Sequence, residues 1–554
     1  MGFNLVACYF LGFLFSMLSF VAQADIHVLY NFQPVYDSLR PYFKIELNFN
    51  SGEREEYILN LPSSDSKNIN IRSIEPKASL FIENKAFPAY PTLKVPKNTP
   101  IKIHYELYDK GIHPDRFLLH GTNLFIVPGA HYAKIADPIS ITLNWPLNST
   151  AFIANSYAPF YSPLNQTQSF NTTLGDLDDA IFIGGNYQYV HVNNPPNGFL
   201  MAYDLPQSSV QPYFDGIKKI VRHQKSQLEE KLNDKNLVIF KENKDLPEGE
   251  VAASKWLNVI LLQANLSTYE KYPERVLAAF SHEHMHIWFS ERLSSADKIY
   301  PRWFFEGFND YFSLKAVHAL NLISTQYYLD YLNGFILCNH FSPGAFIPSD
   351  KIEEDYEKSP LLFFQPYARG HLFAIELDYL LRTHSGNKIN LTVLFKDYFK
   401  YINNLKGEKS HKNKFSIRAL DSLIYQKMGA SFAAQYLALK QKHIINGEAI
   451  TLSSKALWPL FDYSEVDAAD NDFSFDFYKT ITSGVITGVQ KNSLAYKNGL
   501  RNHQKLISYE YDLNARFNPL TLVLEVKANQ KISVSVPIQK IEKKIHLFKL
   551  KSGF

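Results

Sequence analysis

Three histidines and a glutamate lie close together in residues 281–287, which read SHEHMHI. His282 and His286 are four positions apart, so on a helix both imidazoles lie on one face and can converge on one metal ion. Glu283 neighbours that face, where its carboxylate can take a proton from a water molecule and later pass it to a leaving amine. The spacing predicts metal-assisted hydrolysis of a peptide bond, although the same pattern also arises by chance in unrelated helices.

His284 stands inside this pattern but does not fit the metal-binding face. It lies about 200° around the helix from His282, because successive residues of an α-helix are turned by about 100°. We therefore expect His284 to pack against its neighbours or to face solvent, and not to bind the ion.

A third metal ligand follows in residues 303–311, which read WFFEGFNDY. Glu306 lies on a second predicted helix, which can pack antiparallel to the first across a short connection. A surface carboxylate is the alternative, but the aromatic run around Glu306 disfavours it. Together with His282 and His286, Glu306 forms a set of three ligands with a fourth position open, as a catalytic zinc ion requires. We expect one zinc ion at this site.

Asp310 lies one helical turn beyond Glu306 and faces the same way. Zinc-binding histidines commonly donate their free ring N–H to a carboxylate, which fixes the tautomer that binds the ion. We expect the Asp310 carboxylate to accept this hydrogen bond from a ligand histidine, most simply His282.

Two helices separated by a polar break must position these side chains. The apolar pattern predicts helices over residues 273–319 with a break near residues 294–300. Pro273 and Pro301 both stand where a first-turn proline is tolerated. Upstream, the pattern predicts one helix and two strands, over residues 214–232, 237–240 and 256–262.

The flanking sequence divides by its pattern into further units. Residues 25–205 largely alternate apolar and polar residues between Pro, Asn, Gly and Ser clusters, which predicts an antiparallel β-sandwich. Helical periodicity recurs through residues 321–457, and the acidic stretch 458–476 is interpreted as a linker. Residues 477–554 form a separate small β-rich domain. Its strands are expected near residues 484–489, 505–508, 520–526 and 531–537.

The combination of H-E-x-x-H, E-G-F-x-D-Y and a later tyrosine resembles the gluzincin metallopeptidases. Within them, residues 282–288 and 303–311 look closest to the PDZ-containing glycyl aminopeptidase family. The zinc motifs are specific, whereas the match of the β domain is only architectural. The resemblance implies a multidomain α+β fold across nearly the whole chain after residue 24. Its parts are an N-terminal β-sandwich (25–205), a thermolysin-like zinc catalytic domain (206–320), a helical part (321–457) and a C-terminal PDZ-like domain (477–554).

The same resemblance assigns a role to a tyrosine. Residues 365–370 read QPYARG and resemble the family's Tyr-x-Lys-Gly signature, with Arg369 in place of the lysine. In gluzincins this tyrosine donates its hydroxyl to the oxyanion that forms at the cleaved carbonyl. The resemblance therefore implies that Tyr367 stabilises the transition state. Without it, Tyr367 would be one of 34 tyrosines and a core residue by default.

A second part of the resemblance concerns the C-terminal domain. Residues 485–500 resemble the PDZ run V-x-x-V-x-x-x-S-x-A-x-x-A-G-L, with His503 and Gln504 in place of the usual Gly-Asp. The resemblance implies a groove that could take a peptide terminus by strand addition. Because His503 and Gln504 replace Gly-Asp, a bound peptide terminus is one possible partner of this domain and does not follow from the motif alone.

One expected motif is missing before the zinc helix. Aminopeptidases of this type carry a glycine-rich strand that ends in a glutamate, which binds the free amine of the substrate. No G-G-L-E-H or G-A-M-E-N sequence occurs here. The nearest candidates for the amine anchor are Glu248 and Glu250, within residues 247–251.

The first 24 residues form an apolar run that ends in Ala-Gln-Ala. This pattern predicts a secretory signal cleaved after Ala24, with a retained membrane anchor as the alternative. No later segment offers about 18 uncharged apolar residues, so we expect no membrane span in the mature chain. Only Cys8 and Cys338 occur, so the mature chain has no internal disulfide and is expected in a bacterial periplasm.

The net charge of +3 gives no electrostatic argument for binding nucleic acid. We expect a zinc-dependent peptidase that acts on a peptide or protein substrate, with aminopeptidase action implied by the resemblance. The alternatives are an endopeptidase of the same mechanism and a catalytically inactive periplasmic peptide-binding or scaffold protein. The last is disfavoured because a binding protein has no need of the general base Glu283.

Overall fold

The computed structural model contains two compact units. The first comprises Met1–Gln211, Asn233–Pro247 and Ala252–Leu266, and the second comprises Pro212–Leu232, Glu248–Val251 and Ser267–Phe554. The signal expected at residues 1–24 lies outside the described residues, and none of the described helices is long and apolar enough to cross a membrane. The structure describes residues 27–35, 40–61, 69–83, 91–129, 138–145, 152–157, 167–192, 199–228, 236–291, 293–295, 301–404, 413–415, 417–457, 461–510, 520–527, 530–536 and 539–551.

Two sheets of the first unit share one hydrophobic core, as the alternating pattern predicted. Their strand orders are β12-β10-β1-β2-β7-β4 and β5-β6-β3-β9. Every second side chain of β2 is buried, from Phe43 to Phe49. One pair, β1 with β10, is parallel and corrects the expectation of a wholly antiparallel sandwich. The strands are β1 (His27–Val35), β2 (Tyr42–Asn50), β3 (Glu56–Asn60), β4 (Ile69–Glu75), β5 (Leu80–Ile82), β6 (Thr92–Lys94), β7 (Pro100–Leu107), β9 (Val127–Gly129), β10 (Pro138–Asn144) and β12 (Thr167–Thr173).

A smaller sheet of the same unit packs against the strands that follow it in sequence. It has the order β11-β13-β8. Its apolar side chains share a core with those of three later strands, β15 (Phe199–Tyr203), β16 (Asn236–Glu242) and β18 (Val259–Ala264). Two short helices accompany these strands. The elements are β8 (Arg116–His120), α2 (Gly121–Leu124), β11 (Phe152–Asn155), α3 (Leu174–Asp178) and β13 (Ile181–Gly185).

A five-stranded sheet with the order β14-β15-β16-β18-β17 completes the first unit. Its three central strands are parallel and consist of continuous apolar runs, as strands buried on both faces require. Two expectations are corrected here. The sheet includes β14 and β15, which lie within residues 25–205, the range expected for the N-terminal domain. The strand expected over 256–262 is divided by a turn at Leu257. The strands are β14 (Gln188–Val192), β15 (Phe199–Tyr203), β16 (Asn236–Glu242), β17 (Ala252–Trp256) and β18 (Val259–Ala264).

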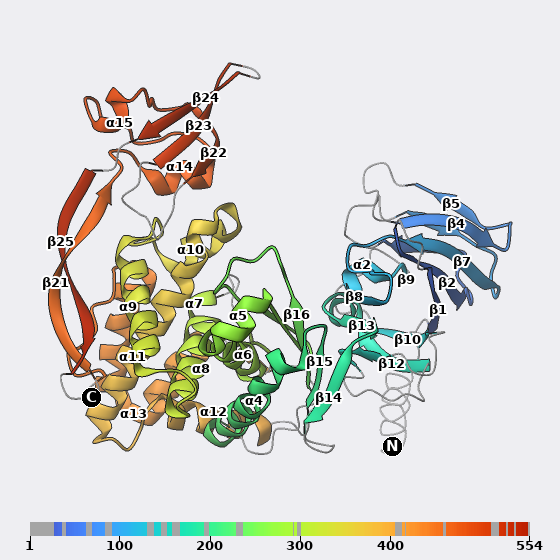
Figure 1. The fold of residues 1–554 in the computed structure, drawn as a ribbon, viewed down its shortest axis with the longest axis horizontal. Helices are drawn as coiled ribbons and strands as arrows, with labels where there is room; N and C mark the ends of the chain where they lie inside the picture. Colours follow the sequence, from blue (N-terminus) through green and yellow to red (C-terminus); the bar gives the residue numbers. More distant parts are fainter. Residues whose placement is uncertain are drawn as a thin grey trace, which may run out of the picture. The chain divides into compact units, whose positions relative to one another are not determined.

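Helices dominate the second unit, as the periodicity predicted (Figure 1). Pro273 is the first residue of α6, where its missing N–H costs nothing. The two helices expected over residues 273–319 are present, and a break at Glu306 divides the second of them. The elements are α4 (Gln207–Leu228), α5 (Leu266–Lys271), α6 (Pro273–His286), η2 (Ile287–Glu291), α7 (Arg302–Phe305), α8 (Gly307–Ala319), α9 (Thr325–Phe341), α10 (Ser349–Asp355), η3 (Tyr356–Lys358), η4 (Pro360–Leu362), α11 (Phe364–Ser385), α12 (Leu391–Asn404), α13 (Ile417–Lys440) and η5 (Gln441–Ile445).

The backbones of α8 and α11 touch at a pair of glycines. A Cβ atom built on Gly307 would lie 2.3 Å from the Cα of Gly370, and one built on Gly370 would lie 1.7 Å from the carbonyl oxygen of Trp303. Both distances are far below any real contact, so only glycine fits at either position. This crossing sets the separation of the two helices.

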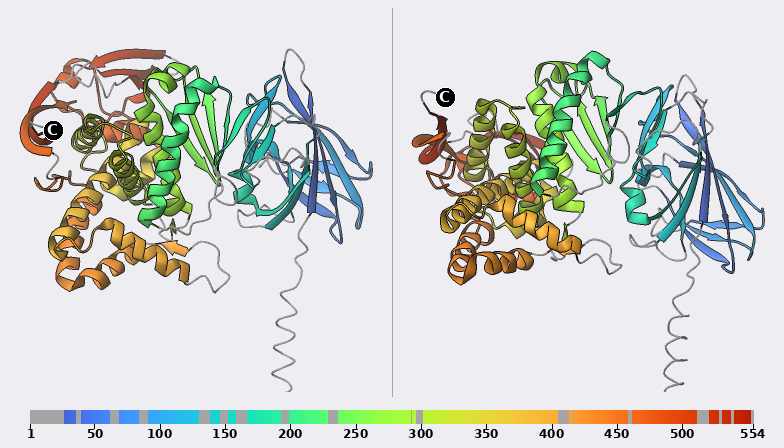
Figure 2. Two further views of the ribbon diagram at one scale, coloured as in Figure 1. Left: turned by 60° about the horizontal axis from the view of Figure 1, so that its bottom comes forward. Right: turned by 90° about the horizontal axis from the view of Figure 1, so that it is seen from below.

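The stretch 458–476, interpreted as an acidic linker, is mostly a long strand. β21 (Phe461–Asp472) pairs along its whole length with β25 (Gln539–Leu550), which was assigned to the C-terminal domain. These two strands form a two-stranded ribbon. It places acidic side chains close to basic ones, as in the 3.0 Å ion pair between Glu465 and Lys544. The side-chain amide of Asn333 in α9 makes two hydrogen bonds to the backbone of Phe548 and fixes the ribbon beside that helix (Figures 1 and 2).

The ribbon leads into a small C-terminal domain with its own hydrophobic core. Three of its expected strands are present and pair in the order β22-β23-β24, whereas residues 484–489 contribute only a single bridge between Val485 and Lys505. Its identity as a PDZ-like domain stays a prediction. The elements are α14 (Phe477–Ser483), α15 (Leu494–Lys497), β22 (Lys505–Glu510), β23 (Leu520–Lys527) and β24 (Gln530–Val536).

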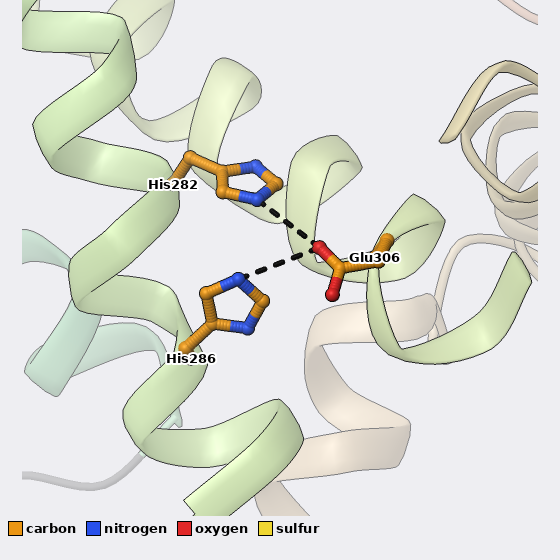
Figure 3. A group of neighbouring side chains, drawn as sticks. All are labelled: His282, His286 and Glu306. Atoms are coloured by element: carbon orange, nitrogen blue, oxygen red, sulfur yellow. Dashed lines mark ion pairs between the residues drawn. The ribbon is translucent and has the colours of Figure 1, made fainter. Parts of the chain in front are cut away.

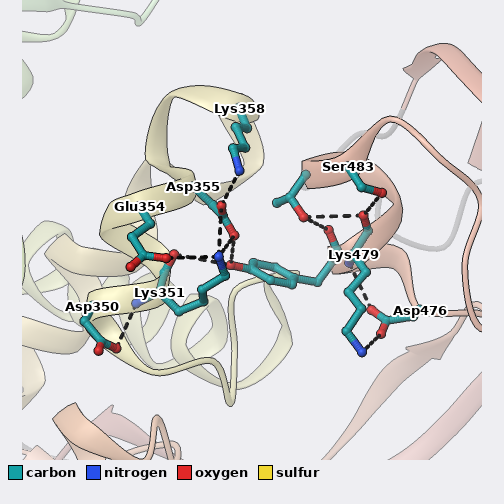
Figure 4. Close-up of polar contacts among 10 residues, drawn as sticks. Asp350, Lys351, Glu354, Asp355, Lys358, Asp476, Lys479 and Ser483 are labelled. Carbon is teal, nitrogen blue, oxygen red and sulfur yellow. Dashed lines mark hydrogen bonds and ion pairs between the residues drawn. The ribbon is translucent and has the colours of Figure 1, made fainter.

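The C-terminal domain contacts the segment between α9 and α11. The Tyr478 hydroxyl donates to Asp355 Oδ2 at 2.6 Å, and this carboxylate, only 2% exposed, also pairs with Lys358 (Figure 4). The hydroxyls of Tyr509 and Ser359 lie 2.6 Å apart, and Leu361 belongs to the core of the C-terminal domain. Polar and apolar contacts together therefore attach this domain to the segment that leads into α11.

The glycine crossing gives a stability prediction. Gly370→Ala forces a methyl group against the carbonyl of Trp303. We therefore expect it to lower the free energy of unfolding by about 1–3 kcal/mol. The matched control is Gly334→Ala in α9, where an added Cβ meets nothing within 4 Å. Because alanine favours a helix over glycine by up to about 1 kcal/mol, the control should not lose stability. Denaturant unfolding of both variants measures the difference, and equal stabilities would contradict the crossing.

Candidate metal centre

Helix α6 presents two imidazoles on one face. The ring centroids of His282 and His286 are 4.9 Å apart, as their spacing of four residues predicted. Both side chains are partly buried, whereas the flanking Ser281, Glu283 and Met285 are buried. The helix turns into the π-helix η2 directly after His286, and such wide turns are frequent at functional sites.

Glu306 completes a cluster of three ligand atoms at the junction of α7 and α8. Its Oε2 atom lies 3.4 Å from Nε2 of His282 and 3.4 Å from Nε2 of His286 (Figure 3). Bonds of about 2.0–2.1 Å at tetrahedral angles place the ligands of a zinc ion about 3.4 Å apart. The structure thus brings together the three predicted ligands, and both separations from Glu306 match those of ligands around a zinc ion.

The protonation of Glu306 also suits a cation. Burial raises the pKa of this carboxyl, but the charges of His286 and His282 outweigh burial and lower it to about 2. Its Oε2 atom is buried and makes no hydrogen bond to the part of the chain that the structure describes. An ionised, buried oxygen that faces two imidazole nitrogens fits the place of a metal ligand.

Asp310 lies behind His282, as predicted. Its Oδ1 atom is 3.3 Å from Nδ1 of His282, so the carboxylate can accept a hydrogen bond from Nδ1–H while Nε2 faces Glu306 at the candidate metal position. Burial alone would lower the pKa of His282, but the neighbouring carboxylates of Asp310 and Glu306 raise it to about 10. Burial likewise raises the pKa of Asp310, but hydrogen bonds from His282 and His371 lower it below its usual range.

Two further residues of this network were not identified from the sequence. His371 places its Nδ1 atom 2.7 Å from Asp310 Oδ2, and the Tyr331 hydroxyl donates to Asp310 Oδ1 at 3.0 Å. His371 is fully buried on α11. It stands four positions after Tyr367 on the same helical face, and this spacing was the one available signal. Nothing local marks Tyr331, since α9 reaches the site only through packing.

Glu283 and Tyr367 lie beside the three ligands. The Tyr367 ring stacks on His282 with centroids 5.8 Å apart. Burial raises the pKa of the Tyr367 hydroxyl far above its usual value, as do the nearby charges of Glu306 and Glu283. The hydroxyl therefore stays protonated and can donate a hydrogen bond. Glu283 is 8% exposed and close enough for its charge to act on both His282 and Tyr367.

The two candidate amine anchors are placed differently. The Glu248 carboxylate accepts hydrogen bonds from Ser267, Lys271 and Tyr272. Tyr272 directly precedes α6, so these bonds hold the Glu248 carboxylate near the N-terminal end of that helix. The role of Glu248 as the anchor stays a prediction. Glu250 is exposed, and its role stays a prediction.

His284 and Arg369 have structural surroundings. His284 is fully buried and its Nδ1 atom lies 2.6 Å from Oε1 of Gln224, so it faces away from the ligand atoms, as expected. Arg369, which replaces the lysine of the family signature, donates from Nη1 to the carbonyl of Ile347 at 2.6 Å and to the hydroxyl of Ser349 at 3.0 Å. It therefore fixes the segment before α10 and does not reach the ligand cluster.

The ligand cluster gives a direct prediction for metal content. Purified protein should hold one zinc ion per chain, because the three donors and their separations match a catalytic zinc site. His286→Ala removes one donor and should lose the ion, while His284→Ala, on the opposite helix face, should keep it. Elemental analysis after dialysis measures both. Full zinc occupancy in His286→Ala would reject the assignment.

The Asp310 network gives a second prediction. Asp310→Ala removes the carboxylate that orients His282, and we expect zinc affinity to fall by about 10- to 100-fold while the fold is kept. His371→Ala should weaken zinc in the same direction but less, since it acts only through Asp310. Competition with a chromogenic chelator measures the affinity, and circular dichroism checks the fold. Unchanged affinity in both variants would contradict an orienting role.

Comparison with known proteins places this fold among solved structures. No protein-family model matches the sequence, and no curated protein is similar to it in sequence. An aminopeptidase N family protein from Idiomarina loihiensis superposes with a TM-score of 0.65, over 95% of this chain and 98% of that chain, at 15% identity. Native yeast LTA4 hydrolase superposes with a TM-score of 0.49 at 13% identity, over 77% of this chain and 68% of its own. The chain thus shares its overall multidomain α+β fold with the first of these proteins.

Proposed function

We propose that this chain is a zinc-dependent peptidase. The observation that carries the proposal is the convergence of His282, His286 and Glu306 on one point, with Glu283 and Tyr367 beside them. Three protein ligands leave a position open for a reactant, which distinguishes a catalytic zinc site from a structural one with four. The fold shared with an aminopeptidase N family protein supports the same function.

The chain's own residues supply the proton transfers. A bound zinc ion would polarise the scissile carbonyl and lower the pKa of water towards about 7. Glu283 accepts a proton from the attacking water and returns it to the leaving amine. Tyr367, kept protonated by burial, donates a hydrogen bond to the oxygen on which negative charge develops. Asp310 holds His282 in the tautomer that keeps Nε2 available for the ion.

Aminopeptidase action is the finer form of this proposal. The family name of the structural neighbour from Idiomarina loihiensis supports it. Glu248 and Glu250 are then the candidates to bind the substrate's amine, which is a cation and needs a nearby carboxylate in a closed site. An endopeptidase of the same mechanism is the second candidate, because no glycine-rich Glu motif precedes the helix that carries His282 and His286.

The remaining parts of the proposal concern location and partners. We propose export to a bacterial periplasm on the strength of residues 1–24. A peptide terminus in the C-terminal domain is a further proposal, which rests on the PDZ-like run in residues 485–500. An inactive scaffold protein stays disfavoured, since Glu283 and Tyr367 would then have no use.

The general base gives the sharpest test of the proposed function. Glu283→Gln should retain the zinc ion and the fold but lose activity by several orders of magnitude, because only the proton acceptor is removed. Glu270→Gln, an exposed glutamate of α5, is the matched control and should cleave like the wild type. A mixed peptide library with products read by mass spectrometry measures cleavage. If Glu283→Gln cleaves as well as the control, the mechanism is wrong.

The same assay separates the two forms of the proposal. A peptide and its N-acetylated twin differ in the charge of the amine, so an aminopeptidase should cleave only the free peptide. Glu250→Ala should then reduce this preference if Glu250 binds the amine. Equal cleavage of both peptides would favour the endopeptidase.

A further inference from the structure

Two phenylalanine side chains near the metal centre are exposed to solvent. Phe363 is 44% exposed and Phe364 is 55% exposed, at the start of α11. Tyr367 follows them by four and three positions, so all three lie on one side of the helix. Large apolar side chains that stand together in solvent mark a binding surface more often than isolated ones do.

Ring contacts connect these phenylalanines to a metal ligand. The Tyr367 ring stacks on His282 at 5.8 Å and on Phe363 at 5.6 Å, between ring centroids. Phe364 meets Phe363 edge-on at 5.2 Å and Tyr367 at 6.4 Å. The aromatic surface therefore begins at the ligand cluster and ends in solvent.

Residues behind the surface hold it in place. Tyr356 is 8% exposed and its ring lies 5.5 Å from that of Phe363. The guanidinium of Arg302 lies 3.9 Å from the Tyr356 ring and pairs with Glu353. A rigid apolar surface loses little conformational entropy when a ligand binds, which favours recognition.

We propose that Phe363 and Phe364 bind an aromatic or large aliphatic side chain of the substrate, next to the bond that is cut. This inference rests on the proposed peptidase function and adds the class of residue that the site prefers. The two phenylalanines and Tyr367 carry no charge, so an apolar side chain gains from leaving water, whereas a charged one would lose its hydration. The occupant is part of the substrate because the surface is continuous with the candidate catalytic group Tyr367.

Matched peptides test the preference in the full zinc-loaded protein. Two pairs are compared, with Ala or Phe placed on either side of the cleaved bond and all other positions identical. For one of the two positions, kcat/KM should be about tenfold or more higher with Phe than with Ala. Phe363→Ala and Phe364→Ala should each reduce this Phe-to-Ala ratio. Tyr425→Ala, which removes an exposed aromatic ring of α13, should leave the ratio unchanged.

A binding measurement separates recognition from catalysis. In the Glu283→Gln protein, calorimetry should show that the Phe peptide binds about tenfold or more tightly than the Ala peptide. Adding Phe364→Ala to this protein should remove most of the difference, because the phenyl ring of the peptide then has less apolar surface to cover it.

The possible outcomes distinguish this inference from the proposed function. Cleavage of the Ala and Phe peptides at equal rates, or a ratio that neither variant changes, overturns the aromatic site while the peptidase stands. Failure to cleave any peptide overturns both. If Phe364→Ala leaves the ratio unchanged but dissociates an oligomer in sedimentation, the surface is an interface between copies and the inference is wrong.

Discussion

The close contact of α8 and α11 at Gly307 and Gly370 is the constraint on which the rest of the site depends. Glu306 directly precedes one glycine, and Tyr367 and His371 flank the other at three positions before and one position after. Any side chain at the crossing would force the backbones apart, because an added Cβ atom would lie only 2.3 Å from Gly370 Cα or 1.7 Å from the Trp303 carbonyl oxygen. Glu306, Tyr367 and His371 would then no longer lie close together, because side chains of fixed length cannot compensate for a shift of the backbone.

A second dependence is electrostatic and centres on Asp310. Its carboxylate accepts hydrogen bonds from three elements: His282 on α6, Tyr331 on α9 and His371 on α11. A buried charge is costly unless it is fully hydrogen-bonded, and three donors meet this requirement. The network therefore joins four helices, α8 included, while it orients one candidate metal ligand, His282. The hydrogen bonds of Asp310 therefore both hold the helices together and orient His282, so the loss of one bond affects packing and the candidate metal site together.

The C-terminal domain contacts the segment of chain that leads directly into the candidate site. Its Tyr478 and Tyr509 bond to the segment between α9 and α11, and its core includes Leu361. Two residues after Leu361, Phe363 and Phe364 begin the aromatic surface that leads to Tyr367. The domain thus restrains the chain immediately before the proposed catalytic tyrosine, through contacts that lie within the second unit.

Local sequence alone determined the parts of the site that one helix or one short run contains. His282 and His286 share a face because the helical period dictates it, and Glu306 and Asp310 follow from the same period on the next helix. The strands of the first sheets were predictable for a similar reason, since alternate burial in β2 repeats every two residues. These features need no knowledge of distant partners.

Only the tertiary structure decided the features that depend on residues far apart in the chain. The acidic stretch of β21 is a strand because β25, about 80 residues later, supplies its hydrogen bonds and its basic side chains. Tyr331 and His371 belong to the Asp310 network because α9 and α11 pack there. Sequence periodicity reports which face of an element is buried, but it carries no information on which other element covers that face.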